Sequence, residues 1–212
     1  MTSVRTLLSD EALALQTQSG SMEAFEGLVL RYEQRIYSFV SQSCRNSADA
    51  AEITQETFVK AYQAIGKFDP TRTFAPWLFT IARRKCIDHF RALKDFPSQH
   101  STLDTHDSSA SPPESFDSND PAELLAQHDE RQHLWDVARR ILSKAQFDAL
   151  WLHYVEDMSV AETARVLRRP QTYIKVLLFR ARQALAAKLK PTRAAPDLSP
   201  ETMPHAYELP VR

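Results

Sequence analysis

The sequence predicts an all-α protein built from two small helical modules that a flexible acidic linker joins. Only three of the 212 residues are glycine, and the helix-favouring residues alanine, leucine, glutamine and arginine are frequent. Apolar residues recur at the period of amphipathic helices in both halves of the chain. Between the halves, serine, proline and acidic residues bury too little apolar area to offset the entropy of ordering. We therefore expect modules at residues 10–93 and 122–189, a linker at 94–121 and a tail at 190–212.

Charge is segregated along the chain, although the formal net charge is only −1. The range Thr163–Pro196 contains nine lysine and arginine residues and no aspartate or glutamate. The range Asp95–Glu130 has the opposite character, with many acidic residues and almost no compensating cations. Charge blocks of this kind indicate charged partners more clearly than the net value does.

Several classes of function are excluded by what the sequence lacks. The two cysteines, Cys44 and Cys86, lie far apart and form neither a zinc motif nor a disulfide framework, which fits a reduced cytoplasm. No apolar run approaches the ~18 residues of a membrane span, and no signal peptide is present, so we expect no membrane insertion. Isolated glycines exclude glycine-rich phosphate loops, and scattered histidines form no ligand set. We therefore predict no metal, no cofactor, no small-molecule substrate and no catalytic residue.

The first module is predicted to contain a helix that starts after Ser9, a second helix from Met22 to Val40 and a third that Asp49 leads. The buried face of the third helix is expected to hold Ile53, Phe58, Ala61, Tyr62 and Ile65. Its outer face carries acidic and amide side chains, namely Asp49, Glu52, Gln55 and Glu56. This face suits a basic protein partner, and the alternative is an ordinary solvated helix face.

The central stretch of the chain, Lys67–Arg91, mixes aromatic and basic residues. Its aromatic residues are Phe68, Phe74, Trp77, Phe79 and Phe90, and its cationic residues include Lys67, Arg72, Arg83, Arg84 and Arg91. Unpaired nucleic acid needs apolar faces on which its bases stack and positive charges along its phosphates. The stretch therefore predicts a surface for melted nucleic acid. The alternative is an amphipathic helix that buries its aromatic rings and exposes its arginines.

The second module is predicted to contain a helix-turn-helix. Ser143 is a good N-cap for one helix, and Ser159 with Glu162 forms a capping box for the next. After Arg168-Arg169-Pro170, a further helix from Gln171 lies in the acid-free basic segment, and its inner face is expected to hold Ile174, Leu178, Ala181, Leu185 and Leu189. This arrangement predicts that the last helix enters a DNA major groove, although the spacing alone also fits an ordinary αα-hairpin. The tail, with five prolines and no helical period, is predicted to be disordered.

In combination, these segments resemble bacterial extracytoplasmic function (ECF) sigma factors of the sigma-70 family. The resemblance lies in AFEGLVLRYEQRIYSFV, DAAEITQETFVKAY, KFDPTRTFAPWLFTIARRKCIDHFR and LSKAQFDALWLHYVEDMSVAETARVL. It implies a cytoplasmic protein that directs RNA polymerase core enzyme to promoter DNA and helps to melt it, while the polymerase performs the chemistry. It also implies an anti-sigma partner. The alternative is a helix-turn-helix regulator that acts without core polymerase, but such a protein needs no base-stacking surface.

The resemblance identifies residues 10–93 as a region two helical bundle and residues 122–189 as region four. It implies that core polymerase contacts Asp49, Glu52, Gln55 and Glu56. It implies that the minus-ten element contacts Lys67, Phe68, Arg72, Phe74, Trp77, Thr80, Arg83, Arg84 and Arg91. It implies that the minus-thirty-five element contacts Gln171, Thr172, Tyr173, Lys175, Arg180 and Arg182.

The chain departs from the family pattern at several positions. Val176 and Leu177 replace a usual Ser and Arg, Arg84 replaces a usual Asn, and Arg168-Arg169-Pro170 lacks the usual turn glycine. Ala51 replaces a usual acidic residue on the core-binding helix. We therefore expect an unusual promoter sequence, or a weakened grip on core polymerase. In the second case, phosphorylation of Thr54 or Ser47 would restore the missing negative charge.

Overall fold

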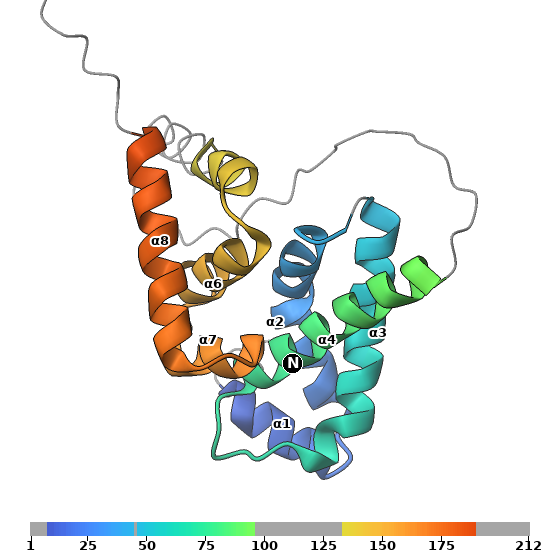
Figure 1. Ribbon diagram of the computed structural model, residues 1–212. Helices are drawn as coiled ribbons and strands as arrows, with labels where there is room; N and C mark the ends of the chain where they lie inside the picture. The colour runs from blue at the N-terminus through green and yellow to red at the C-terminus, as the bar shows by residue number, and fades with distance from the viewer. Residues whose placement is uncertain (1–7, 45, 96–132, 190–212) are drawn as a thin grey trace, which may run out of the picture.

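The computed structural model describes residues 8–44, 46–95 and 133–189, and within these ranges all regular secondary structure is helical (Figure 1). The predicted all-α fold is therefore confirmed. The first module contains α1 (Asp10–Gln18), α2 (Met22–Ser41), α3 (Ser47–Ala64), the 3-10 turn η1 (Ile65–Lys67) and α4 (Phe74–Asp95). The second contains a helical stretch at 133–141, α6 (Lys144–Tyr154), α7 (Val160–Leu167) and α8 (Gln171–Leu189). Residues 96–121 of the predicted linker and the predicted tail, 190–212, lie outside the described residues.

Short polar side chains start most of the helices. Ser9 and Ser21 each accept a hydrogen bond from the backbone N–H three residues on, both at 3.2 Å. Asn46 does the same for α3 at 2.7 Å, so this helix begins at Ser47, two residues before the predicted Asp49. Both predicted starts in the second module are confirmed, because Ser143 and Ser159 form capping boxes with Gln146 and Glu162. Each such cap stabilises its helix by about 1 kcal/mol.

The core of the first module lies where the predicted apolar stripes of α2, α3 and α4 meet. Fully buried side chains include Leu28, Ile36, Ile53, Leu78 and Phe79. Tyr62 does not join them, which corrects the predicted stripe of α3. Its ring is 41% exposed and rests on Phe25 with 5.0 Å between centroids, because it lies at the edge of the stripe.

The second module packs around Trp151, which is fully buried and lies 5.0 Å from the ring of Trp135. The helix-turn-helix follows the prediction: α7 and α8 both pack on α6 and on each other. The turn between them places Arg168 at φ 51°, a left-handed conformation that costs a residue with a side chain roughly 1–2 kcal/mol. Leu189, predicted to be inside, is exposed because it lies at the very end of α8, beyond the core.

The two modules touch in this structure. Figure 1 shows α7 lying against the first turns of α4, and α7 packs more extensively on α4 than on α6 or α8. This contact joins the predicted minus-ten helix to the first helix of the helix-turn-helix.

Candidate nucleic-acid interface

The predicted core-binding residues all lie on the outer side of α3. Glu52 and Gln55 are exposed. Asp49 and Glu56 also contact residues of α4: the Asp49 carboxylate lies 3.6 Å from His89 Nε2, and Glu56 accepts a hydrogen bond from Lys85 Nζ at 2.9 Å. The acidic surface of α3 thus contacts α4 through two of its carboxylates.

An apolar groove of about 910 Å³ lies beside this acidic surface, between α2 and α3. Exposed apolar side chains line it, namely Met22, Leu30, Val59 and Tyr62. The groove was not predicted from the sequence. The sequence does indicate it, because these large apolar side chains fall at the edge of the predicted core stripes or beyond them. A sizeable apolar surface of this kind commonly marks an interaction site.

The two candidate phosphorylation sites differ in access. Thr54 is only 6% exposed, and its hydroxyl donates a hydrogen bond to the Ala50 carbonyl at 2.7 Å inside α3. The hydroxyl is therefore poorly accessible in this conformation, which disfavours phosphorylation of Thr54 and leaves it a prediction. Ser47, the first residue of α3, is exposed, and its modification stays a prediction.

Three aromatic residues of the central stretch, Phe68, Phe74 and Trp77, form a cluster whose rings are mostly buried. Phe68 is 4% exposed and Phe74 is 1% exposed, so neither ring offers a face to a base in this conformation. The two rings lie 5.5 Å apart, and each contacts Trp77, at 5.2 Å and 5.5 Å. This corrects the predicted stacking surface, because the three rings pack on one another and only Trp77 remains partly exposed.

The cations of the central stretch lie on the surface in two groups. Lys67 and Arg72 are exposed at the loop, where the Arg72 guanidinium lies 3.2 Å from Asp69. Arg84 and Arg91 flank Asp88 on α4 at 3.9 Å each, and both are exposed. Such loose exposed pairs contribute little stability, so these arginines can exchange their partner for a phosphate at small cost.

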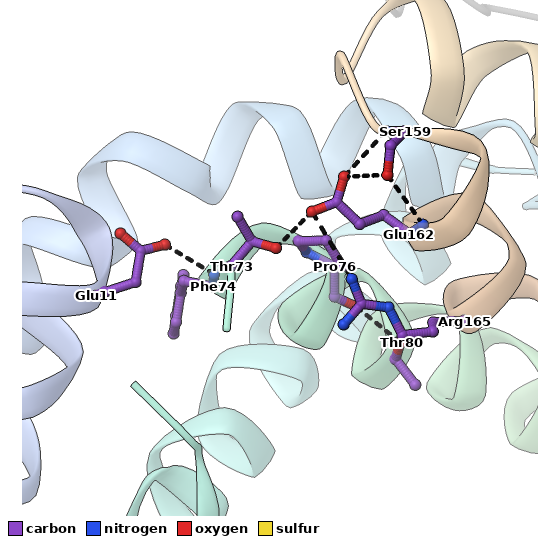
Figure 2. Close-up of polar contacts among 8 residues, drawn as sticks. All are labelled: Glu11, Thr73, Phe74, Pro76, Thr80, Ser159, Glu162 and Arg165. Carbon is purple, nitrogen blue, oxygen red and sulfur yellow. Dashed lines mark hydrogen bonds and ion pairs between the residues drawn. The ribbon is translucent and has the colours of Figure 1, made fainter. Parts of the chain in front are cut away.

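Figure 2 shows how the start of α4 is tied to α1 on one side and to α7 on the other. The Phe74 backbone N–H donates to Glu11 Oε1 at 3.0 Å, which satisfies an orphan donor at the start of α4. The Thr73 hydroxyl donates to Glu162 Oε1 at 2.5 Å. Glu162 Oε2 meanwhile accepts from the Ser159 backbone N–H at 2.9 Å and from its hydroxyl at 2.7 Å. One carboxylate therefore caps α7 and binds the other module.

Other predicted minus-ten residues lie at the same boundary. The Thr80 hydroxyl donates to the Pro76 carbonyl at 2.7 Å within α4 and is only partly exposed (Figure 2). Arg83 is half-buried close to Asp148, Arg168 and Arg169 of the second module. Burial lowers the pKa of the Arg83 guanidinium, the two arginines lower it further, and Asp148 acts in the opposite direction. The second module thus covers part of the surface predicted for the melted strand.

An ion pair between Arg35 and a fully buried carboxylate forms a second contact between the modules. Arg35 on α2 donates to Glu156 through Nε at 2.8 Å and lies 2.7 Å away through its terminal nitrogen. The Glu156 side chain is fully buried, and burial raises its pKa, although Arg35 opposes the shift. Two further bonds support the boundary, from Arg139 to Gln42 at 2.6 Å and from Lys144 to Ser43 at 2.5 Å.

The six predicted minus-thirty-five residues of α8 are all exposed, as recognition of a groove requires. The Arg169 guanidinium lies over the ring of Tyr173 at 5.6 Å, and Arg182 contacts the Tyr154 hydroxyl at 3.5 Å. The two residues of α8 that depart from the family pattern lie on different faces of the helix: Leu177 faces the core, whereas Val176 faces outward. Only the change at Val176 alters the outer face of the helix.

Comparison with known families agrees with this geometry. Residues 28–95 match the family described as Sigma-70 region 2, and residues 140–185 match the family described as Sigma-70, region 4. The chain belongs to the sigma-70 family. This sigma factor is similar to the ECF RNA polymerase sigma factor BldN of Streptomyces coelicolor, with 34% identity over 182 residues. That match covers 84% of this chain and 64% of BldN, so the chain spans slightly less than two thirds of this relative.

A second relative is matched over almost its whole length. The ECF RNA polymerase sigma-E factor of Escherichia coli K12 is 28% identical over 191 residues, which cover 87% of this sigma factor and 96% of the relative. Among solved structures, that of CnrH in complex with the cytosolic domain of CnrY has a TM-score of 0.57 and 26% identity, and the match covers 85% and 96% of the two chains. Both curated relatives are ECF factors, and the predicted membership of the ECF group is confirmed.

No helix within the described ranges is both long and apolar enough to cross a bilayer. The same part of the chain contains no group of three or more His, Cys, Asp or Glu side chains arranged to hold a metal ion.

Proposed function

We propose that this sigma factor directs RNA polymerase core enzyme to specific promoters, helps to melt them, and acts in the cytoplasm. The observation that carries the proposal is the presence of both sigma regions in one chain, each with an exposed charged surface. The first module offers acidic side chains to a protein, and the second offers a basic helix to a duplex. We assign no catalytic step to the chain, since the polymerase forms the phosphodiester bonds.

The core-binding surface combines the acidic face of α3 with the neighbouring groove. Glu52 and Gln55 supply exposed polar contacts, and the groove supplies apolar area around Tyr62. Interfaces commonly join a well-packed apolar or aromatic centre to a polar rim. Asp49 and Glu56 lie on the side of this surface that faces α4, where they contact His89 and Lys85.

The minus-ten element is held mainly by exposed cations and by Trp77. Stacking of one base on an aromatic ring contributes about 1–3 kcal/mol, which offsets part of the cost of melting. The Phe68 and Phe74 rings pack against Trp77 and hold its ring in place. Arg84 and Arg91 lie along the same helix and neutralise phosphates of the separated strand.

The modules separate before both can engage a promoter. In the described conformation α7 binds Thr73, which lies between the proposed minus-ten residues Arg72 and Phe74. The Arg168–Arg169 turn lies close to Arg83, another residue of the proposed minus-ten surface. An anti-sigma partner that favours this closed arrangement would keep the factor inactive. The related CnrH is known in complex with the cytosolic domain of another protein, CnrY, and this supports a protein partner for the present chain.

In-vitro transcription tests the proposal. Purified core polymerase and this chain are incubated with a pool of fragments from the source genome, and the transcript starts are mapped. We expect starts that share two spaced upstream motifs and that are absent with core alone. Specific DNA binding without initiation and without core binding would instead indicate a helix-turn-helix regulator.

A further inference from the structure

The outward face of α8 has an apolar centre. Val176 is 43% exposed and Phe179 is 55% exposed, whereas Ile174 is fully buried. At 3.6 residues per turn, each residue advances about 100° around the helix, so Val176 lies about 200° from Ile174. Val176 therefore points almost directly away from the module core.

Cationic residues surround this apolar centre. Lys175 and Arg180 are exposed beside Val176, and Arg169 lies at the turn that precedes the helix. No acidic residue occurs between Thr163 and Leu189, which includes the whole of α8. A protein partner that binds through the apolar side chains alone has no need of the surrounding positive charge. A DNA duplex does need it, because its phosphates are negatively charged. The arrangement favours phosphates at the flanks of the helix and bases opposite Val176.

Val176 is also placed where a recognition helix meets bases. It is the sixth residue of α8, and the N-terminal part of such a helix contacts base edges in the major groove. The valine side chain neither donates nor accepts a hydrogen bond. In the major groove the C5-methyl group of thymine is the one apolar feature that distinguishes the bases.

We propose that Val176 recognises a thymine of the minus-thirty-five element by contact with its C5-methyl group, with Phe179 extending the apolar contact towards the next base pairs. The inference rests on the proposed sigma function and specifies its duplex target. It assigns selectivity at this position to a methyl group, whereas Lys175 and Arg180 supply affinity through phosphates without regard to sequence.

Replacement of thymine by deoxyuridine tests the proposal, because this change removes only the methyl group. Holoenzyme formed from core polymerase and the full-length chain first selects promoters from a pool with a randomised minus-thirty-five region. Each selected thymine is then replaced in turn by deoxyuridine, and binding is measured. At one position we expect deoxyuridine to weaken binding by about fourfold, the effect of losing one buried methyl contact.

The variant Val176→Ala identifies the residue responsible. It should bind thymine and deoxyuridine equally at that position and keep its preferences elsewhere. Leu189→Ala is the matched control, because Leu189 is also an exposed aliphatic residue of α8 but lies thirteen positions further along. At a rise of 1.5 Å per residue, it is about 20 Å from Val176 along the helix axis, so this variant should discriminate as the wild type does.

Three outcomes would overturn the inference. The selected elements could lack an enriched thymine, deoxyuridine could bind as well as thymine at every position, or Val176→Ala could still discriminate between them. A loss of core or protein-partner binding by Val176→Ala, with base preference unchanged, would show that the apolar centre is a protein contact. Absence of any core-dependent initiation is a different result, which would contradict the proposed sigma function itself.

Discussion

Glu156 of the second module is fully buried and bonded to Arg35 of the first, at 2.7 and 2.8 Å. The two residues are 121 positions apart in the chain. Removal of one partner from a buried ion pair lowers protein stability by about 3–5 kcal/mol, because the other charge is left buried and unpaired. The pair therefore makes the packing of the two modules depend on one arginine at the surface of α2.

Arg35→Ala should open the closed arrangement. Without the guanidinium, Glu156 regains solvation most easily when the modules separate, so we expect a larger radius of gyration in small-angle X-ray scattering. Lys85→Ala is the control, because it breaks an ion pair with Glu56 inside the first module and should leave the dimensions unchanged. An Arg35→Ala protein as compact as the wild type would show that the pair does not hold the modules together.

Thr73→Val should weaken the same arrangement more mildly. It removes the hydroxyl that binds Glu162 but leaves the Ser159–Glu162 capping box intact (Figure 2). The expected cost is about 1 kcal/mol, the net value of one hydrogen bond, with no loss of helicity. Combining Thr73→Val with Arg35→Ala in scattering measurements would show whether the two contacts act on one opening step. If the double variant has the same radius of gyration as Arg35→Ala alone, loss of the ion pair is sufficient to separate the modules. A larger radius in the double variant would show that the Thr73–Glu162 bond acts separately.

Glu11→Ala should destabilise the first module through the start of α4. The carboxylate accepts the hydrogen bond of the Phe74 N–H, so its removal leaves a helix donor without its partner. We expect a loss of about 0.5–2 kcal/mol in unfolding by urea, as for an N-cap substitution. Glu11→Gln keeps an acceptor oxygen and should recover most of the stability. Equal losses in both variants would assign the effect to charge instead.

Core binding should depend on both parts of the proposed surface. Glu52→Ala removes an exposed carboxylate of α3, and Tyr62→Ala removes the aromatic ring beside the groove. We expect Tyr62→Ala to weaken binding to core polymerase at least tenfold, which corresponds to about 1.4 kcal/mol. Glu52→Ala should act mainly through the association rate and should lose its effect at high salt. The exposed residue Gln16 on α1 provides the control, and a Gln16→Ala effect as large as that of Tyr62→Ala would contradict the assignment.

Both thiols should react slowly near neutral pH. Burial raises the pKa of Cys44 to about 11 and that of Cys86 to about 12. Because the thiolate is the reactive form, alkylation by iodoacetamide should be slow at pH 7 and should rise about tenfold per pH unit up to pH 9. Mass spectrometry of the labelled sites measures this. Labelling at pH 7 at the rate of a free cysteine, whose pKa is about 8.5, would contradict it.

Local patterns in the sequence predict much of this fold. The N-cap at Ser143, the capping box at Ser159 and the turn before Gln171 depend on residues a few positions apart, so the sequence alone is sufficient to place them. The burial of Phe68 and Phe74 was not predicted, because an aromatic and basic stretch fits both a stacking surface and a packed ring cluster. The packed cluster is what forms, since Tyr32 of α2 packs on the ring of Phe74 and the Phe68 and Phe74 rings pack on each other.

Contacts between distant residues could not be predicted. Nothing near Arg35 or Glu156 in the sequence indicates that they meet, because the contact depends on how two separately folded modules lie together. The apolar groove depends in the same way on the packing of α2 against α3. By contrast, helical periodicity is sufficient to predict that Val176 is exposed, because its neighbours Ile174 and Leu178 define the inner face of α8.

The most direct test of the central claim is permanganate footprinting of a selected promoter, because permanganate oxidises unpaired thymines. We predict reactive thymines in the minus-ten region when core polymerase and this chain are present together, and none with either alone. Duplex that stays unreactive in a stable holoenzyme–promoter complex would contradict the proposal that this chain helps to melt its promoters.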